Sequence, residues 1–149
     1  GLEQSDVLFI ESWSPEIEKQ LQVERYELDG ELRIQSNIDK LSGHPGQKMV
    51  LPVQIENPKD MIIPCRSLNF HPSYRLFVPN GEVLSHYEAP RSPIELLPAS
   101  SVTDHELQVI LPKETGEYEM RLTFVHEHVA WWTDFDYPTH VIRIIVRKQ

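Results

Sequence analysis

The sequence lacks several features that would point directly to a function. Among 149 residues there is one cysteine, Cys65, so no disulfide can form within the chain, and this favours a reducing compartment such as the cytoplasm. Acidic residues outnumber basic ones by 23 to 14, giving a net charge of −9, and nucleic acid is therefore an unfavourable partner. No apolar run approaches the roughly 20 residues that span a bilayer, so we predict no direct membrane insertion.

Signatures of catalysis are missing as well. The chain has no G-x-S-x-G nucleophile turn and no glycine-rich phosphate loop. Cys65 follows Pro64 in an apolar stretch, which is typical of a buried small residue. Asp134 and Asp136 could bind calcium with loop carbonyls, but alternating acids in a loop are common and nonspecific. We therefore expect no enzymatic activity, no cofactor and no metal site.

Helical periodicity is confined to one stretch, residues 14–28, with Ser14 as a candidate N-cap and Pro15 as the first helical residue. The alternative is that this stretch ends early and that residues 22–28 already form a strand. The opening letters "GLEQSD" are typical of a domain cut from a longer protein. We assign residues 1–30 to an N-terminal segment, either a linker helix or a first strand, and residues 31–149 to one domain.

Alternation of apolar and polar residues with a period of two runs through the rest of the chain. Residues 48–57 place Leu51, Val53 and Ile55 on one face, and residues 104–112 and 117–132 alternate in the same way. Pro-Asn-Gly at 79–81 predicts a hairpin turn. Several short strands with tight turns predict an all-β protein, an antiparallel β-sandwich or jelly roll. The last strand, residues 140–148, either pairs within its own sheet or crosses to a second copy, so a homodimer is plausible.

The stretch "VHEHVAWW", residues 125–132, carries two histidines around a glutamate. On a strand, His126 and His128 would share one face, where they could ligate a metal. A third ligand would then have to come from His71, His86, His105 or Glu127. No recognisable metal spacing orders these residues, so the alternative is that His126 is a partly buried, hydrogen-bonded histidine and Glu127 a paired surface acid. In either case His126 or His128 could also contact a ligand.

The two tryptophans of this stretch would face opposite sides of a strand. One of them therefore belongs to the core, which is the ordinary position for a tryptophan. The other would be at least partly exposed and could offer an apolar platform to the C–H face of a sugar ring, with polar groups around it. Of the two, Trp132 is the preferred candidate for this platform.

Arginines are the candidates for polar recognition in an acidic chain. Alternation places His71, Ser73 and Arg75 on one face of their strand, and Arg121 and Thr123 on the corresponding face of the long strand. If these two strands share a sheet, they form one polar patch, with Arg91 from a proline-rich loop as a further candidate. An arginine fork binds a carboxylate or phosphate through two parallel hydrogen bonds. The alternative for each arginine is a surface ion pair with one of the many acidic residues.

These motifs together resemble a β-sandwich module attached to bacterial surface-polysaccharide machinery. The resemblance covers about two-thirds of the chain, and its motifs are mostly turn glycines, strand alternation and core aromatics. The residues that carry it are Val53, Ile55, Asn57, Tyr74, Arg75, Leu76, Gly81, Arg91, Pro98, Pro112, Gly116, Tyr118, Met120, Val125, Glu127, Trp131 and Trp132. Residues 5–30 have no counterpart in the pattern, which leaves the point of attachment open.

The resemblance implies two possible parents. One is the ATP-binding subunit of an O-antigen ABC transporter, whose C-terminal carbohydrate-binding domain is a cytoplasmic dimeric jelly roll that recognises the terminal residue of a finished glycan. That parent would be peripheral to the inner membrane and would act with the transporter's membrane subunit. The other is a glycosyltransferase or methyltransferase, with this chain as an accessory interaction or dimerisation module. On the first interpretation we expect a noncatalytic site that binds a terminal sugar, with an acidic cap of the 3-deoxy-octulosonic-acid (Kdo) type as one hypothesis. The expected contacts are His71, Ser73, Arg75, Arg91, Arg121, His126, His128 and Trp132.

Overall fold

The computed structural model describes residues 31–128, 130–134 and 139–149, with the side chain of Trp132 left out. The N-terminal segment, with its helix and strand alternatives, and Asp136 lie outside these residues. Within the described part the chain is built of β-strands, with a single turn of α-helix and one 3-10 turn. The elements are β1 Arg33–Gln35, β2 Lys40–Gly43, β3 Lys48–Asn57, α3 Cys65–Leu68, β4 Phe70–Phe77, β5 Ser101–Ile110, β6 Gly116–His126, β7 Ala130–Trp131, η1 Trp132–Asp134 and β8 His140–Val146.

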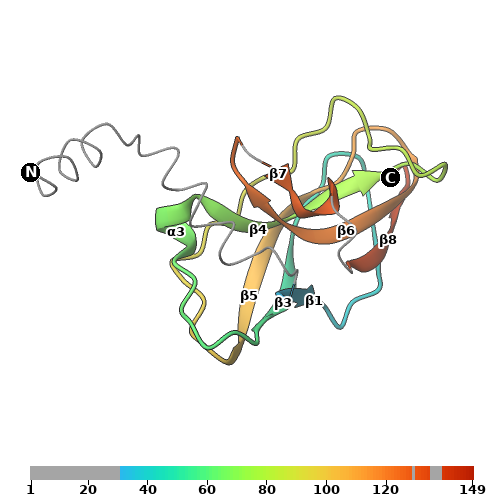
Figure 1. The fold of residues 1–149 in the computed structure, drawn as a ribbon. Helices are drawn as coiled ribbons and strands as arrows, with labels where there is room; N and C mark the ends of the chain where they lie inside the picture. Colours follow the sequence, from blue (N-terminus) through green and yellow to red (C-terminus); the bar gives the residue numbers. More distant parts are fainter. Residues whose placement is uncertain (1–30, 129, 135–138) are drawn as a thin grey trace, which may run out of the picture.

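Two sheets form the layers of a β-sandwich, as the alternation predicts. The smaller sheet has the order β1-β3-β5, and the larger has the order β2-β8-β6-β4, with β7 paired beside β6. In Figure 1, β3 and β5 run across the direction of β4 and β6. One pair departs from the predicted antiparallel arrangement, because β2 runs parallel to β8, with Leu41 opposite Ile144.

Alternating side chains from both sheets fill the space between them. From β3, Leu51, Val53 and Ile55 point inward and are at most 3% exposed, whereas the residues between them face solvent. On β5, the residues that alternation predicts to face inward, among them Leu107 and Val109, are buried as well. From the other sheet, Met120, Leu122 and Phe124 on β6 are also buried, so each layer contributes one apolar face to a single core.

Two local predictions at the ends of β4 are only partly right. The Pro-Asn-Gly turn forms, with Gly81 at a φ of 92°, but its second arm makes a single bridge, Phe77 to Val83, instead of a strand. At the other end, alternation predicts a strand from Ser67 onward, but Ser67 and Leu68 belong to the short helix α3, which buries Cys65 and Leu68. Burial raises the pKa of the Cys65 thiol to about 12, as expected for a small core residue.

The last strand, β8, pairs within its own sheet. It lies between β2 and β6 and is hydrogen-bonded to both, with Ile144 opposite Leu41 on one side and Tyr118 on the other. Both edges of β8 are therefore hydrogen-bonded to strands of the same chain. Pairing within its own sheet is the first of the two alternatives that the sequence left open. Among the described residues, no helix has the length and apolar character needed to cross a bilayer.

Candidate functional site

The outer face of the larger sheet carries the polar rows predicted from alternation. Strands β4 and β6 are neighbours, with Ser73 opposite Thr123 and Arg75 opposite Arg121. Residues directly opposite in an antiparallel pair project from the same face, so the condition for one polar patch is met. Ser73 and Thr123 are nevertheless buried, at 1% and 2% exposure, because other segments of the chain cover the middle of this face.

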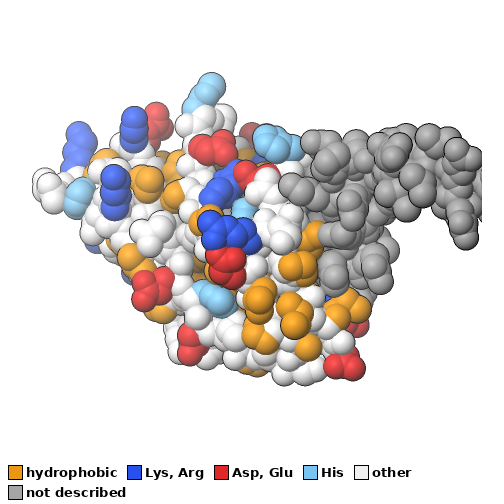
Figure 2. All heavy atoms as spheres, turned by 90° about the vertical axis from the view of Figure 1, so that its left-hand side faces the viewer, with side chains coloured by type: hydrophobic (Ala, Val, Ile, Leu, Met, Phe, Trp, Pro, Cys, Tyr) orange, Lys and Arg blue, Asp and Glu red, His pale blue; other side chains and the backbone are white. Residues whose placement is uncertain are grey.

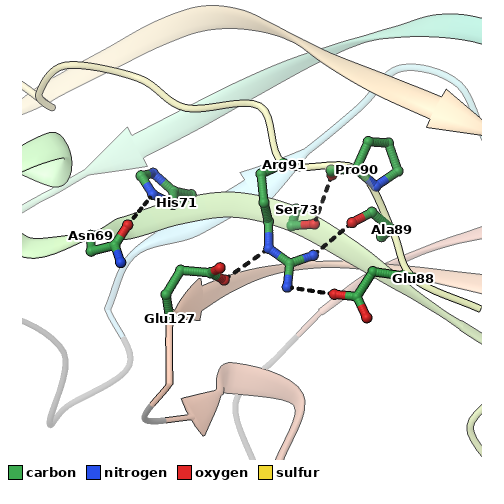
Figure 3. A network of polar contacts seen from close by, with 8 residues as sticks. All are labelled: Asn69, His71, Ser73, Glu88, Ala89, Pro90, Arg91 and Glu127. Carbon is green, nitrogen blue, oxygen red and sulfur yellow. Dashed lines mark hydrogen bonds and ion pairs between the residues drawn. The ribbon is translucent and has the colours of Figure 1, made fainter.

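A turn after β6 brings Glu127 over this face. The backbone N–H of Glu127 donates a hydrogen bond to the carbonyl of Asn69 (3.1 Å). Asn69 ends helix α3 in the left-handed conformation, with φ 54° and ψ 43°, which asparagine tolerates better than most residues. The Asn69 side-chain oxygen also accepts a hydrogen bond from Nε2 of His71 (2.9 Å; Figure 3). The junction between α3 and β4 therefore fixes both the Glu127 turn and the His71 ring.

Arg91 joins this turn to the proline-rich loop. Its Nε donates to Glu127 (2.8 Å), and its terminal nitrogens donate to the Glu88 carboxylate (3.0 Å) and the Ala89 carbonyl (2.6 Å). Figure 3 shows the guanidinium between these acceptors. Beside it, the Ser73 hydroxyl points at the Pro90 carbonyl at 3.5 Å. The loop is thus held across β4 by one charged group that uses most of its donors.

Trp131, on the short strand β7, lies against two arginines of this face. The guanidinium carbons of Arg75 and Arg91 are 5.1 and 4.9 Å from its ring centroid, within the range of cation–π contacts. Arg75 also forms an ion pair with Asp134 (3.0 Å), whose other oxygen accepts the backbone N–H of Trp131 (3.3 Å). We call this set the Trp131 cluster: Arg75, Glu88, Arg91, Glu127, Trp131 and Asp134.

Each predicted arginine has an acidic partner, which is the alternative that the sequence left open for it. Arg75 pairs with Asp134, Arg91 with Glu88 and Glu127, and Arg121 with Glu119 at 3.0 Å. Glu127 is thereby the paired acid that was expected as one possibility. In the surface view, basic and acidic side chains lie beside one another on the face shown (Figure 2). The cluster is therefore rich in hydrogen-bonding groups without a surplus of positive charge.

The remaining predicted residues lie apart from the cluster or are covered. Strand β6 ends at His126, and His128 lies in the following turn with a φ of 63°, so the prediction that the two histidines share a strand face is wrong. His126 is 3% exposed and opposite Phe70 on the core face. Ser73 anchors the loop from beneath. Neither His126 nor Ser73 is a surface group, and a contact of either residue with a ligand stays a prediction.

Arg121 lies farther along the same face. Its guanidinium carbon is 3.8 Å from the ring centroid of Phe77, and it donates to Glu119. It shares the sheet face with Arg75, but its partners Glu119 and Phe77 do not belong to the Trp131 cluster. In the part of the chain that the structure describes, no three histidine, cysteine or acidic side chains come together as a metal site.

A shallow hollow opens beside the tryptophan. It has a volume of about 110 Å³, and its lining includes Arg75, Leu84, Tyr87, Glu88 and Trp131. The rings of Trp131 and Tyr87, the Glu88 carboxylate and the Arg75 guanidinium thus meet at one small depression, and Arg91 lies against the Trp131 ring. Such a set can place an apolar surface under a ligand while planar polar groups exchange hydrogen bonds with its edge.

His71 gives this region a testable dependence on pH. Burial lowers the pKa of His71 below its ordinary value of 6.5, the Glu127 carboxylate partly offsets this, and Arg91 adds to the lowering. A depressed pKa in the folded state means that the neutral ring contributes stability above pH 6.5 that is lost as the pH falls through the folded-state pKa. His105, also with a lowered pKa, contributes in the same direction.

We therefore expect the melting temperature to fall between about pH 7.5 and about pH 5.5, and to fall less in His71→Gln than in the parent protein. Thermal denaturation followed by circular dichroism at both pH values measures this difference. His86→Gln, at an exposed histidine, is the matched control and should retain the parent's full decrease. An unchanged decrease in His71→Gln would show that protonation of His71 is not opposed by folding.

Of the six cluster residues, the sequence named only Arg75 and Arg91 as ligand contacts. It suggested Glu127 as a paired acid or metal ligand and Asp134 as a nonspecific calcium ligand, and it gave no role to Glu88. Trp132 was preferred over Trp131, and because its side chain is not described, a role for Trp132 stays a prediction. Which of the two adjacent tryptophans faces the site depends on where the chain turns after β6, so a turn signal in the sequence would have been needed. No glycine, proline or asparagine marks the turn at Glu127 and His128, so the position of Trp131 opposite Val125 could not be deduced.

Comparison with known proteins gives structural neighbours only. No family model and no curated protein matches the sequence. Among solved structures, the CARDB domain of a Pyrococcus furiosus protein is 14% identical and aligns over 80% of this chain and 94% of its own, with a TM-score of 0.45. A PapD-like domain of human CEP192 is 16% identical over 80% and 87%, with a TM-score of 0.41. The C-terminal domain of wzt is 12% identical over 79% and 71%, with a TM-score of 0.47.

Proposed function

We propose that this chain is a noncatalytic carbohydrate-binding domain and that the Trp131 cluster is its binding site. The observation that carries the proposal is a partly exposed tryptophan beside a hollow, surrounded by arginine–carboxylate pairs. A sugar ring is apolar on its faces and polar on its rim. It can rest against an indole while its hydroxyls bond to guanidinium and carboxylate groups, and both kinds of group converge here.

The charge balance of the cluster bears on which sugar would bind. Arg75 and Arg91 each hold a carboxylate of the protein, so an acidic sugar would have to displace Asp134, Glu88 or Glu127. A neutral sugar needs no displacement, because its hydroxyls can donate to the carboxylates and accept from the guanidinium groups. We therefore expect neutral sugars to bind at least as well as acidic ones, in place of the Kdo-type cap that the sequence suggested.

On this proposal the ligand is the terminal part of a bacterial surface polysaccharide such as O-antigen. The motif resemblance points to the cytoplasmic ATP-binding subunit of an ABC exporter, which would act at the inner membrane with a membrane subunit and as a homodimer. In that setting, binding of a finished glycan end would select it for export. Nothing in the Trp131 cluster resembles an activated nucleophile or a general acid–base pair, and the function is proposed as recognition alone.

A titration of the three tryptophan indole N–H signals by NMR tests this proposal. The probes are galactose, mannose, glucose, rhamnose and Kdo, each as the free monosaccharide, and Trp131→Phe assigns the Trp131 signal. We expect the Trp131 signal to shift with at least one neutral sugar. Arg91→Ala should weaken this response, whereas Arg143→Ala, which removes an exposed arginine paired with Glu117 on the same sheet, should not.

Three outcomes separate the alternatives. A response to Kdo alone would restore the acidic-cap hypothesis and refute our expectation for neutral sugars. A response that Arg91→Ala leaves unchanged would place the sugar outside the Trp131 cluster. If no indole signal moves with any sugar, carbohydrate binding at this tryptophan is refuted, and the accessory interaction or dimerisation module becomes the better explanation.

A further inference from the structure

A second and larger hollow adjoins the Trp131 cluster. It has a volume of about 550 Å³ and lies between the segment 84–88 and the turn that connects β5 to β6. Leu84, Tyr87 and Glu88 line both hollows. The hollow at Trp131, at about 110 Å³, is smaller than the roughly 300–1,000 Å³ of ordinary small-molecule sites, whereas the second falls within that range.

The lining of the second hollow has the same amphipathic character as the cluster. Leu111 and Tyr118 are 1% and 8% exposed and form an apolar floor. Lys113, Glu114 and Glu88 are exposed and stand at the rim. A ligand with apolar faces and polar edges that binds in one hollow would therefore meet an apolar floor and a polar rim in the other hollow as well.

Hydrogen bonds hold the walls of both hollows in place. Tyr87 donates to the carbonyl of Ile110 (2.5 Å) and accepts from Tyr74 (2.6 Å), whose oxygen accepts the N–H of Ile110 (3.1 Å). Burial raises the pKa of both phenols, so both keep their protons. On the far wall, Tyr118 donates to the carbonyl of Glu114 (2.8 Å). The surface between the hollows is therefore preformed, which lowers the entropic cost of binding across it.

We propose that the ligand is an oligosaccharide that crosses the 84–88 segment, with its terminal residue at Trp131 and its following residues in the second hollow. This inference rests on the proposed carbohydrate-binding function and adds that one sugar residue does not fill the site. The hollow at Trp131 is small, at about 110 Å³, so we infer that additional contacts come from neighbouring residues of the same glycan chain. The shared walls supply those contacts without an intervening gap.

Calorimetric titration with sugars of increasing length tests the inference. The probes are the mono-, di- and tetrasaccharides of mannose, galactose, glucose and rhamnose. For a sugar whose monosaccharide binds, we expect the tetrasaccharide to bind about 10-fold more tightly or better, which corresponds to about 1.4 kcal/mol. Ser85→Trp, a bulky change at an exposed position that lines only the second of the two hollows, should remove this gain and leave monosaccharide affinity unchanged.

Ser67→Trp, at an exposed serine on α3 that lines neither hollow, is the matched control and should keep the gain with length. Equal affinity for mono- and tetrasaccharides would overturn the inference while leaving recognition at Trp131 intact. A gain that survives in Ser85→Trp would overturn it too, since the extra residues would then lie elsewhere. Absence of binding by every probe would instead refute the proposed function itself. Melting temperatures of both variants establish that each is folded.

Discussion

Replacing Phe124 by alanine is expected to lower the free energy of unfolding by about 3–5 kcal/mol. Phe124 is 1% exposed and lies on β6, an interior strand of the larger sheet. Its ring stacks on Phe70 with centroids 5.2 Å apart and planes 9° from parallel. Truncation removes the buried apolar surface and leaves a cavity that the two sheets cannot readily close. The free energy of unfolding of a domain is about 5–15 kcal/mol in total, so the variant should lose a large part of its stability.

Urea denaturation of the parent and the variant measures this loss. Val102→Ala is the control, because Val102 is also on a strand but is 61% exposed, and its truncation should cost less than about 1 kcal/mol. A loss at Phe124 as small as that at Val102 would mean that the ring does not lie between tightly packed sheets. The packing of the sandwich would then have to differ from the arrangement of β4 and β6 described above.

Strand alternation made much of the fold predictable. Leu51, Val53 and Ile55 on β3 are buried because a period of two assigns them to one face of a pleated strand, and that rule needs no knowledge of the partner strand. The same rule correctly placed Ser73 and Arg75 on one face of β4, and Arg121 and Thr123 on one face of β6. It does not say which strands meet, so the parallel contact of β2 with β8, more than 90 residues apart, left no local signal.

Short elements escaped prediction for a different reason. Helix α3 has four residues, about one turn, so no repeat of the helical period can be detected in it. Strand β2 also has four residues and ends at Gly43, within a stretch whose glycines and proline indicate a turn. Both elements are fixed by tertiary contacts, which override weak local propensity in short segments.

The candidate site was predictable as a set of residue types but not as an arrangement. Arg91 and Glu127 are 36 positions apart and meet at 2.8 Å only because the loop before Arg91 crosses β4 and the turn at Glu127 is held by Asn69. Each contact depends on a backbone that no alternation pattern describes. The sequence therefore indicated arginines and a tryptophan as candidates, while the structure determines that Trp131 contacts both Arg75 and Arg91.

Truncation of Trp131 to alanine is expected to reduce affinity for the best-binding sugar about 10-fold or more, since tryptophans at the centre of a binding site commonly contribute about 2 kcal/mol or more. The change removes the apolar platform and also the ring contacts of Arg75 and Arg91. Both guanidinium groups would then lose one of the contacts that orient them. Affinity should therefore fall through lost stacking and through less ordered hydrogen bonding to the sugar edge.

Calorimetry on three variants separates these two causes. Trp131→Phe keeps a ring under the sugar and should retain part of the affinity, whereas Trp131→Ala should retain little. Arg91→Lys keeps the positive charge but loses the fork that holds Glu127, Glu88 and the Ala89 carbonyl together. If Arg91→Lys binds as weakly as Trp131→Ala, the oriented guanidinium is as important as the ring. If Trp131→Ala binds as tightly as the parent, the indole takes no part in recognition.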